Sequence, residues 1–389
     1  MRCGALFLLL AGAGIVPAAA EPWVIPSAQY FPGDAELDVG GQAGGAAFGA
    51  SGNGGSAHIS GAAKLTARLH RDYDSGLSLG FNTTLTASDI LSRGRYGGDA
   101  VEQAYGEARI GFGRIEIGQV DGAGYQLAVS GPKVDAAVSL DDPQTTFFRD
   151  PSTHRAFTDS FALRSQVGAS SNYAKFVFVS TNLLGAQLAV SFTPNQGKDL
   201  LPFLREGAHI PGRQADIWEG AIKYSDDLGP VSLTAYAGAA EGRAEHKPAG
   251  QEGVSDLAAG LRADYSLNDD LTLSLGGAWR QSNAYAFQIE RSFKSATTRV
   301  LQSSAALTYD SWMLGVEFGD GNAGKVTGAP LIALTGYQSS IGYNFSNSIQ
   351  LSAGWQRLNY ERSSGTFYNG RPRIALDAGF LHLSLKTSQ

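Results

Sequence analysis

Ionisable side chains of both signs gather in one polar stretch of the chain, between Ser139 and Arg155. They are Asp141, Asp142, Arg149, Asp150, His154 and Arg155. Opposed charges of this kind in a narrow aqueous space can sort solutes by size and sign. The stretch lies within a longer segment, 119–171, that reads as a loop. A connection of that length inside a compact domain is usually functional.

The sequence offers little for bond-making chemistry. Gly76-Leu-Ser-Leu-Gly80 matches the G-x-S-x-G of a nucleophile elbow, which requires a sharp strand-to-helix turn. Here the five residues open a regular amphipathic strand instead. The six histidines lack metal-ligand spacing, and Asp320-Gly-Asn-Ala-Gly324 lacks the rest of a calcium loop. We therefore expect no enzymatic activity, no cofactor and no bound metal.

Residues 1–20 have the features of a secretory signal peptide. Arg2 supplies the positive start, Ala5 to Val16 is apolar, and Ala18-Ala-Ala20 forms a small-residue cleavage site. The apolar run is too short for a transmembrane anchor. The single cysteine, Cys3, lies in this segment. Residues 21–389 are therefore expected to form one domain without disulfides or thiolate metal ligands.

Composition narrows the class of protein further. The chain has 50 glycines among 389 residues and a formal net charge of −6. An acidic balance argues against nucleic acid as a partner, because nucleic-acid binding normally needs a basic face. After the signal peptide no apolar run is long enough for a transmembrane helix.

Hydrophobic residues recur with a period of two from Ala35 onward, which predicts strands. In the segment 58–70, Leu65 and its alternate neighbours form an apolar side, while Lys64 and Arg68 lie on a polar side. Sixteen such segments are predicted: 35–48, 58–70, 77–86, 103–110, 114–118, 173–180, 186–193, 218–225, 231–239, 257–265, 271–279, 301–309, 312–318, 337–343, 349–355 and 374–386.

Short turns and longer loops alternate between these segments, which is typical of an all-β, antiparallel, up-and-down transmembrane barrel of sixteen strands. In lipid the sheet must close so that every backbone group finds a partner. A secreted β-sandwich or a β-propeller would also alternate, but the apolar sides here are thin and rich in alanine. Aromatic residues are expected to form an interfacial girdle beside the short turns; they are Tyr265, Trp279, Tyr309, Trp312, Phe318, Tyr343 and Trp355.

Such a barrel would have an aqueous lumen, which the segment 120–170 is long enough to constrict. Parity along the strands predicts the charged residues that would line it: Lys64, Arg68, Glu107, Arg109, Arg114, Glu116, Glu219, Asp256, Arg262, Asp264 and Arg280. Asp135, Asp141 and Asp142 of the long segment are expected to face the basic side chains of the early strands. For any single residue, a solvated or locally paired role is an equal alternative.

Two segments resemble the Gram-negative general porins. They are Gln103 to Gln119, with its Q-A-Y, G-F-G and final G-Q, and Lys175 to Pro194. The resemblance implies an outer-membrane homotrimer of sixteen-stranded barrels, each with its third loop folded inward, through which ions and small hydrophilic solutes diffuse. A solute-specific channel, or less plausibly a barrel enzyme, is the alternative. The family usually ends in an aromatic residue, whereas here either Leu385 takes that place or a short extension follows the strand.

Overall fold

The computed structural model describes residues 25–31, 33–88, 101–141, 148–150, 152–154, 157, 163–196, 213–245, 249–285, 288–293, 296–324 and 330–388. The expected signal peptide, residues 1–20, lies outside these ranges, as does Asp142.

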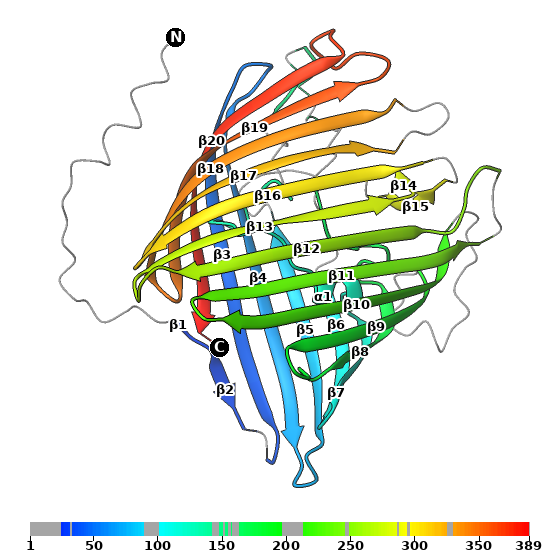
Figure 1. Ribbon diagram of the computed structural model, residues 1–389, viewed down its shortest axis with the longest axis vertical. Coiled ribbons are helices and arrows are strands. Elements are labelled where there is room, and N and C mark those ends of the chain that lie inside the picture. The colour runs from blue at the N-terminus through cyan, green and yellow to red at the C-terminus, as the bar shows by residue number, and fades with distance from the viewer. Residues whose placement is uncertain are drawn as a thin grey trace.

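Sixteen of the described strands pair antiparallel, each with the next, and β20 pairs with β3, so that the sheet closes into a barrel (Figure 1). This closure confirms the predicted fold and excludes a sandwich or propeller. The strands are β3 (Glu36–Ser51), β4 (Ala57–Asp72), β5 (Ser78–Ser88), β6 (Val101–Ile110), β7 (Gly113–Gln119), β8 (Ala174–Ser180), β9 (Ala186–Asn195), β10 (Gln214–Leu228), β11 (Val231–Ala244), β12 (Ser255–Ser266), β13 (Leu271–Ser282), β16 (Thr298–Tyr309), β17 (Trp312–Ala323), β18 (Ile332–Ser346), β19 (Ile349–Arg362) and β20 (Arg373–Ser388).

Smaller elements complete the described chain. A short helix, α1 (Ala123–Gln126), follows β7, and β14 (Ala284–Tyr285) pairs with β15 (Gln288–Ser292) beyond the barrel. Near the chain ends, β1 (Ile25–Pro26) pairs in parallel with the end of β20, and β2 (Ala28–Tyr30) pairs with β3. Leu385 pairs with Ile349 of β19, and Thr387 and Ser388 pair with β1. The last strand therefore carries a short extension that is paired with the N-terminal region.

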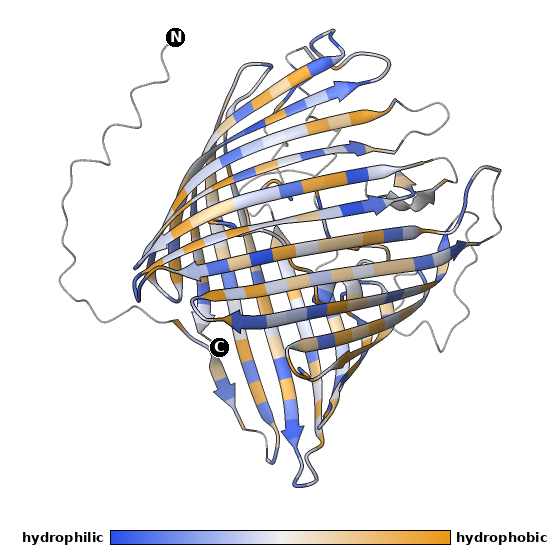
Figure 2. Cartoon of the chain, viewed as in Figure 1, coloured by the Kyte–Doolittle hydropathy of each residue, from blue (hydrophilic) through white to orange (hydrophobic). Residues whose placement is uncertain are grey.

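Apolar and polar residues alternate along the strands (Figure 2). In β4, Ile59, Leu65 and Leu69 are exposed, as a lipid-facing surface requires. On the opposite side the hydroxyl oxygen of Thr66 lies 3.4 Å from the hydroxyl oxygen of Thr84 in β5. The predicted assignment of the two faces is confirmed for these strands.

Several strands continue beyond their predicted ends. β18 begins at Ile332 rather than Tyr337, and β19 ends at Arg362 rather than Trp355. The reason is that Leu334 and Leu358, both buried, stand on the otherwise polar face, so the alternation of polar and apolar residues ends before the strand does. These side chains belong to a buried apolar cluster that also contains Leu376 and Tyr360.

The expected aromatic girdle needs correction. Tyr265, Tyr309, Trp312 and Tyr343 lie beside short turns, as predicted. Trp279, Phe318 and Trp355 do not, because the short turns next to their strands come before Leu271, Trp312 and Ile349, at the opposite ends. Their strands also continue past them to Ser282, Ala323 and Arg362. Among the described residues no helix has the length and apolarity to cross a membrane.

Candidate functional site

The described part of the connection between β7 and β8 runs along the polar face of the barrel in the order of the strands. The carbonyl of Val129 lies over Gly260 of β12, where an added Cβ would come within 1.9 Å of its oxygen. Gly131 lies over Gly276 of β13, whose carbonyl oxygen would be 2.9 Å from a Cβ at position 131. At these two places the backbones approach so closely that only glycine fits.

Asp135 lies further along the same connection. Its carboxylate lies 2.6 Å from Nδ1 of His382 in β20 and accepts a hydrogen bond from Ser352 of β19. The side chain of Asp135 is buried. We expected Asp135 to face the basic side chains of the early strands, but it instead ties the connection to the last two strands of the barrel.

Polar side chains of the barrel hold the backbone of this connection. Such contacts satisfy peptide groups that would otherwise be buried without partners. Glu317 accepts from the N–H of Leu140 (3.3 Å), and Gln338, Gln350 and Gln356 donate to the carbonyls of Val138 (2.6 Å), Val134 (3.2 Å) and Ser139 (3.4 Å).

The returning half of the connection is held in the same way. The N–H of Gly168 donates to Asp256 of β12 at 3.2 Å, and Ser165 donates to Gln302 of β16 at 3.1 Å. Arg280 forms two hydrogen bonds with Asp256, of 2.8 and 2.6 Å, and both side chains are almost fully buried. Arg280 was expected to line an open pore. The structure instead places it in a buried ion pair next to the connection.

Basic side chains lie together on β4, β6 and β7. Arg68 and Arg109 share the carboxylate of Glu107, and Arg114 pairs with Glu116 at 2.7 Å. The arginine side chains are 30%, 47% and 33% exposed, whereas those of Glu107 and Glu116 are 6% and 3% exposed. Solvent therefore reaches mainly the arginine side chains of this group and hardly the glutamates. Lys64 extends the basic group on β4 and pairs with Glu102 at 2.7 Å.

One residue of α1 joins this basic group to the connection. Gln126 accepts from Arg114 at 2.7 Å and donates to Glu116 at 2.6 Å. The position of α1 therefore influences how Arg114 is held.

Of the other predicted residues, Asp141 pairs with Lys133 of the same connection and accepts from Gln302. Arg262 pairs with Asp264 on its own strand at 2.9 Å, and no hydrogen bond or ion pair joins it to the described residues of the connection. Sequence reasoning missed Gln126, Lys133 and Gln302. Gln126 and Lys133 lie in a segment without the period of a strand, so no pattern predicts where their side chains point. The partners of Gln302, Asp141 and Leu163, are distant in the chain. Alternation of polar and apolar residues could place only Gln302 on the polar face.

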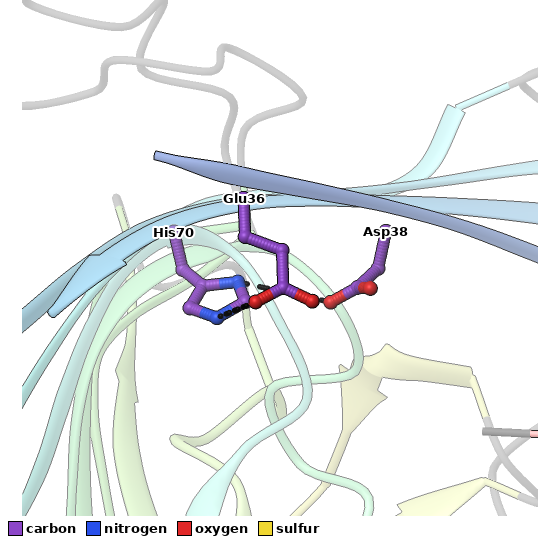
Figure 3. A group of neighbouring side chains, drawn as sticks. All are labelled: Glu36, Asp38 and His70. Atoms are coloured by element: carbon purple, nitrogen blue, oxygen red, sulfur yellow. Dashed lines mark ion pairs between the residues drawn. The ribbon is translucent and has the colours of Figure 1, made fainter. Parts of the chain in front are cut away.

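Glu36 and Asp38 of β3 and His70 of β4 are a group of possible metal ligands among the described residues (Figure 3). Nε2 of His70 lies 3.5 Å from Glu36, and Nδ1 lies 3.7 Å from Asp38. The two carboxylates thus face different ring nitrogens, and both accept from the amide of Gln29 at 3.1 Å. This arrangement suits a hydrogen-bonded cluster better than a single coordination centre.

Solved structures show which proteins share this architecture. An anion-selective porin from Comamonas acidovorans is 13% identical with a TM-score of 0.57, and the match covers 90% of this chain and 99% of that one. For the outer-membrane protein OmpT of Vibrio cholerae the values are 12% and 0.55, with 92% and 99% covered. For an A104W variant of the Rh. blastica porin they are 15% and 0.54, with 90% and 99% covered. No curated protein sequence matches.

At these identities the solved structures support the fold alone. The sequence itself gives the family, because a sequence model of the Gram-negative porins matches residues 5–363. The chain therefore belongs to the Gram-negative porin family, whose members are outer-membrane channels for diffusion.

Proposed function

We propose that this porin is a general diffusion pore for ions and small hydrophilic solutes, and that residues 120–170 constrict its lumen. One observation carries the proposal. The described part of this connection is hydrogen-bonded along the polar face of β10, β12 and β16–β20, while the exposed arginines lie on β4, β6 and β7. The remaining passage would run between the connection and the basic strands. No catalytic step is part of the proposal.

The electrostatics of such a passage follow from the burial of its charges. Arg68, Arg109 and Arg114 would present their guanidinium groups to the solute, whereas Glu107 and Glu116 are buried. A low-dielectric wall around a narrow pore focuses the field of such groups. Lys133 and Asp141 would contribute opposite charges from the connection.

Planar-bilayer recordings test the constriction directly. We expect a variant in which a short Gly/Ser linker replaces residues 128–165 to show a higher single-channel conductance than the natural chain, because the wide lumen of a sixteen-stranded barrel would be opened. This linker spares α1 and the basic side chains of β4, β6 and β7. Unchanged conductance would contradict the proposal. A conductance that saturates with one solute would indicate a solute-specific channel instead.

We also propose that the barrel is a homotrimer in the outer membrane, and that the chain is exported and its signal peptide is cleaved off before Glu21. A shallow apolar groove of about 570 Å³ on the outer surface supports close packing against a neighbour. It is lined by small residues, among them Gly41, Ala43 and Ala63, with Leu65 and Leu85 beside them.

A bulky residue in this groove should separate the subunits. We expect Ala63→Trp to lower the fraction of trimer on native gels. Ala259→Trp is the control, since Ala259 is an exposed residue of β12 between lipid-facing Leu257 and Leu261. Equal trimer fractions in the two variants would place the subunit contact elsewhere.

A further inference from the structure

We infer that Lys175 and Glu219 form a buried clasp that holds the two ends of the connection 120–170 together and so positions the constriction. The place where these two ends meet is called the neck of the connection. This inference rests on the proposed function of that connection as the narrow part of the pore. The clasp is defined here by Lys175 of β8, Glu219 of β10 and the backbone groups that they bind.

Lys175 binds both ends of the connection at once. Its ammonium donates to the carbonyl of Val120, where the connection begins, at 2.7 Å. It also donates to the carbonyls of Ser170, at 3.3 Å, and Ser171, where the connection ends. An ammonium has three N–H donors, so these three carbonyls match its full capacity. The side chain is completely buried, with a relative exposure of 0%.

Glu219 also bridges the outgoing and returning ends. One carboxylate oxygen accepts from the N–H of Gly124 in α1 at 3.1 Å, and the other accepts from the N–H of Ser170 at 2.9 Å. A Cβ on Gly122 would lie 2.1 Å from this carboxylate, so the chain can pass only with glycine there. The carboxylate and the backbone therefore fit closely.

Ser170 connects the two charged residues. Its N–H donates to Glu219 and its carbonyl accepts from Lys175, so opposite charges lie at the two ends of one residue's backbone. Burying either charge is costly unless it is paired and fully hydrogen-bonded. Each of the two charges has its hydrogen-bond partners only while the neck is closed. The closed position of the neck is therefore favoured over others.

The clasp reaches the basic side chains through α1. Glu219 holds Gly124 of this helix, and Gln126 of the same helix bonds Arg114 and Glu116. If the neck opened, the constriction would become mobile and Arg114 would lose its fixed orientation. A change in ion selectivity would therefore indicate that the clasp positions the constriction, whereas a loss of barrel stability alone would not.

Bilayer recordings on Lys175→Met test the clasp, because methionine keeps the length and apolar stem but has no N–H donors. We expect an intact, heat-modifiable barrel with raised open-channel noise, several open levels in place of one, and a shifted reversal potential in a KCl gradient. Lys223→Met is the matched control. Lys223 lies on β10, and no hydrogen bond or ion pair joins it to the described residues of the connection, so this variant should keep the noise and single open level of the natural chain.

Glu219→Gln is a second variant in case Lys175→Met does not fold. Its amide keeps the shape of the side chain but can accept only one of the two N–H groups, so noise should rise again. If both variants record like the natural chain while the 128–165 linker variant has raised conductance, the clasp is refuted and the constriction stands. If the linker variant is also unchanged, the proposed function itself fails.

Discussion

Asp135 and His382 join the third long connection of the barrel to its last strand, with 2.6 Å between Nδ1 of His382 and the carboxylate. The same carboxylate accepts from the hydroxyl of Ser352 and from the backbone N–H of Ala137 at 2.9 Å. A segment between β7 and β8 is thus fixed to β19 and β20 by one buried acid. Its protonation should weaken that attachment.

Burial alone would raise the pKa of Asp135, but the hydrogen bonds with His382 and Ser352 outweigh burial and leave the pKa below its usual 3.8. A carboxyl group with a lowered pKa adds stability above its unfolded pKa, and this stability is lost as pH falls through the folded value. We expect Asp135→Asn to reduce the free energy of unfolding at pH 7 by about 1.5–3 kcal/mol, the range for hydrogen bonds to a charged group.

The difference from the natural chain should shrink as pH falls below 3.8. Thermal unfolding in detergent at pH 7 and at acid pH measures it. Asp150→Asn is the control in the same connection, since the carboxylate of Asp150 accepts hydrogen bonds from nearby Ser152 and Thr153, and none of these bonds reaches the barrel. Equal stability of Asp135→Asn and the natural chain at pH 7 would show that the attachment contributes nothing.

The strands and their two faces were predictable because both depend on local alternation. Leu65 and Thr66 are neighbours in sequence, and a strand places them on opposite faces whatever surrounds it. The contacts of Asp135 were not predictable in this way. They depend on which strands the connection meets once the barrel has closed, and nothing near Asp135 in the sequence identifies Ser352 or His382.

The same limit explains the strand ends. Leu334 and Leu358 stand on the face that was expected to be polar, and there they share a buried cluster with Leu140 and Leu163 of the connection. A sequence pattern that expects water on that face ends the strand too early. The apolar residues on this face are buried in a cluster that the connection shares.

Gly260 offers a test of that docking. A Cβ there would lie 1.9 Å from the carbonyl oxygen of Val129, and this atom is backbone, so the connection itself must shift. We expect Gly260→Ala to destabilise the docked connection by about 1–3 kcal/mol, as overpacking does, and to expose it to limited proteolysis. A Cβ on Gly220 of β10 meets nothing within 4 Å, so Gly220→Ala should resist protease like the natural chain. Similar cleavage of the two variants would argue against this contact.

The outer surface can be tested with a neighbouring pair on β4. Leu65 is 47% exposed on the apolar face, whereas Thr66 lies beside Thr84 on the polar face. We expect Leu65→Arg to lower the free energy of unfolding in lipid by roughly 2–4 kcal/mol, since it places a charge against hydrocarbon. Thr66→Arg should cost much less because its charge can reach water. Equal losses of unfolding free energy in the two variants, measured by urea unfolding in vesicles, would contradict the assignment of the faces.

Lys133 and Asp141 provide a test of the charge in the proposed constriction. They form an ion pair within the connection, and their side chains are 20% and 15% exposed. Asp141→Asn would leave the charge of Lys133 unbalanced opposite Arg68 and Arg109. Since a positively charged pore repels cations, we expect the reversal potential in a KCl gradient to shift in the direction of greater anion selectivity.

Lys133→Gln should shift the reversal potential the other way, and the double variant Lys133→Gln/Asp141→Asn should return close to the natural value, because the pair is removed without changing the net charge. Both single shifts should shrink at 1 M salt, where the Debye length is about 3 Å. Lost folding of the connection would change conductance in all three variants alike and would not reverse sign between the two single substitutions. Opposite shifts therefore report charge near the permeating ions, and reversal potentials unchanged at low salt would place Lys133 and Asp141 away from the pore.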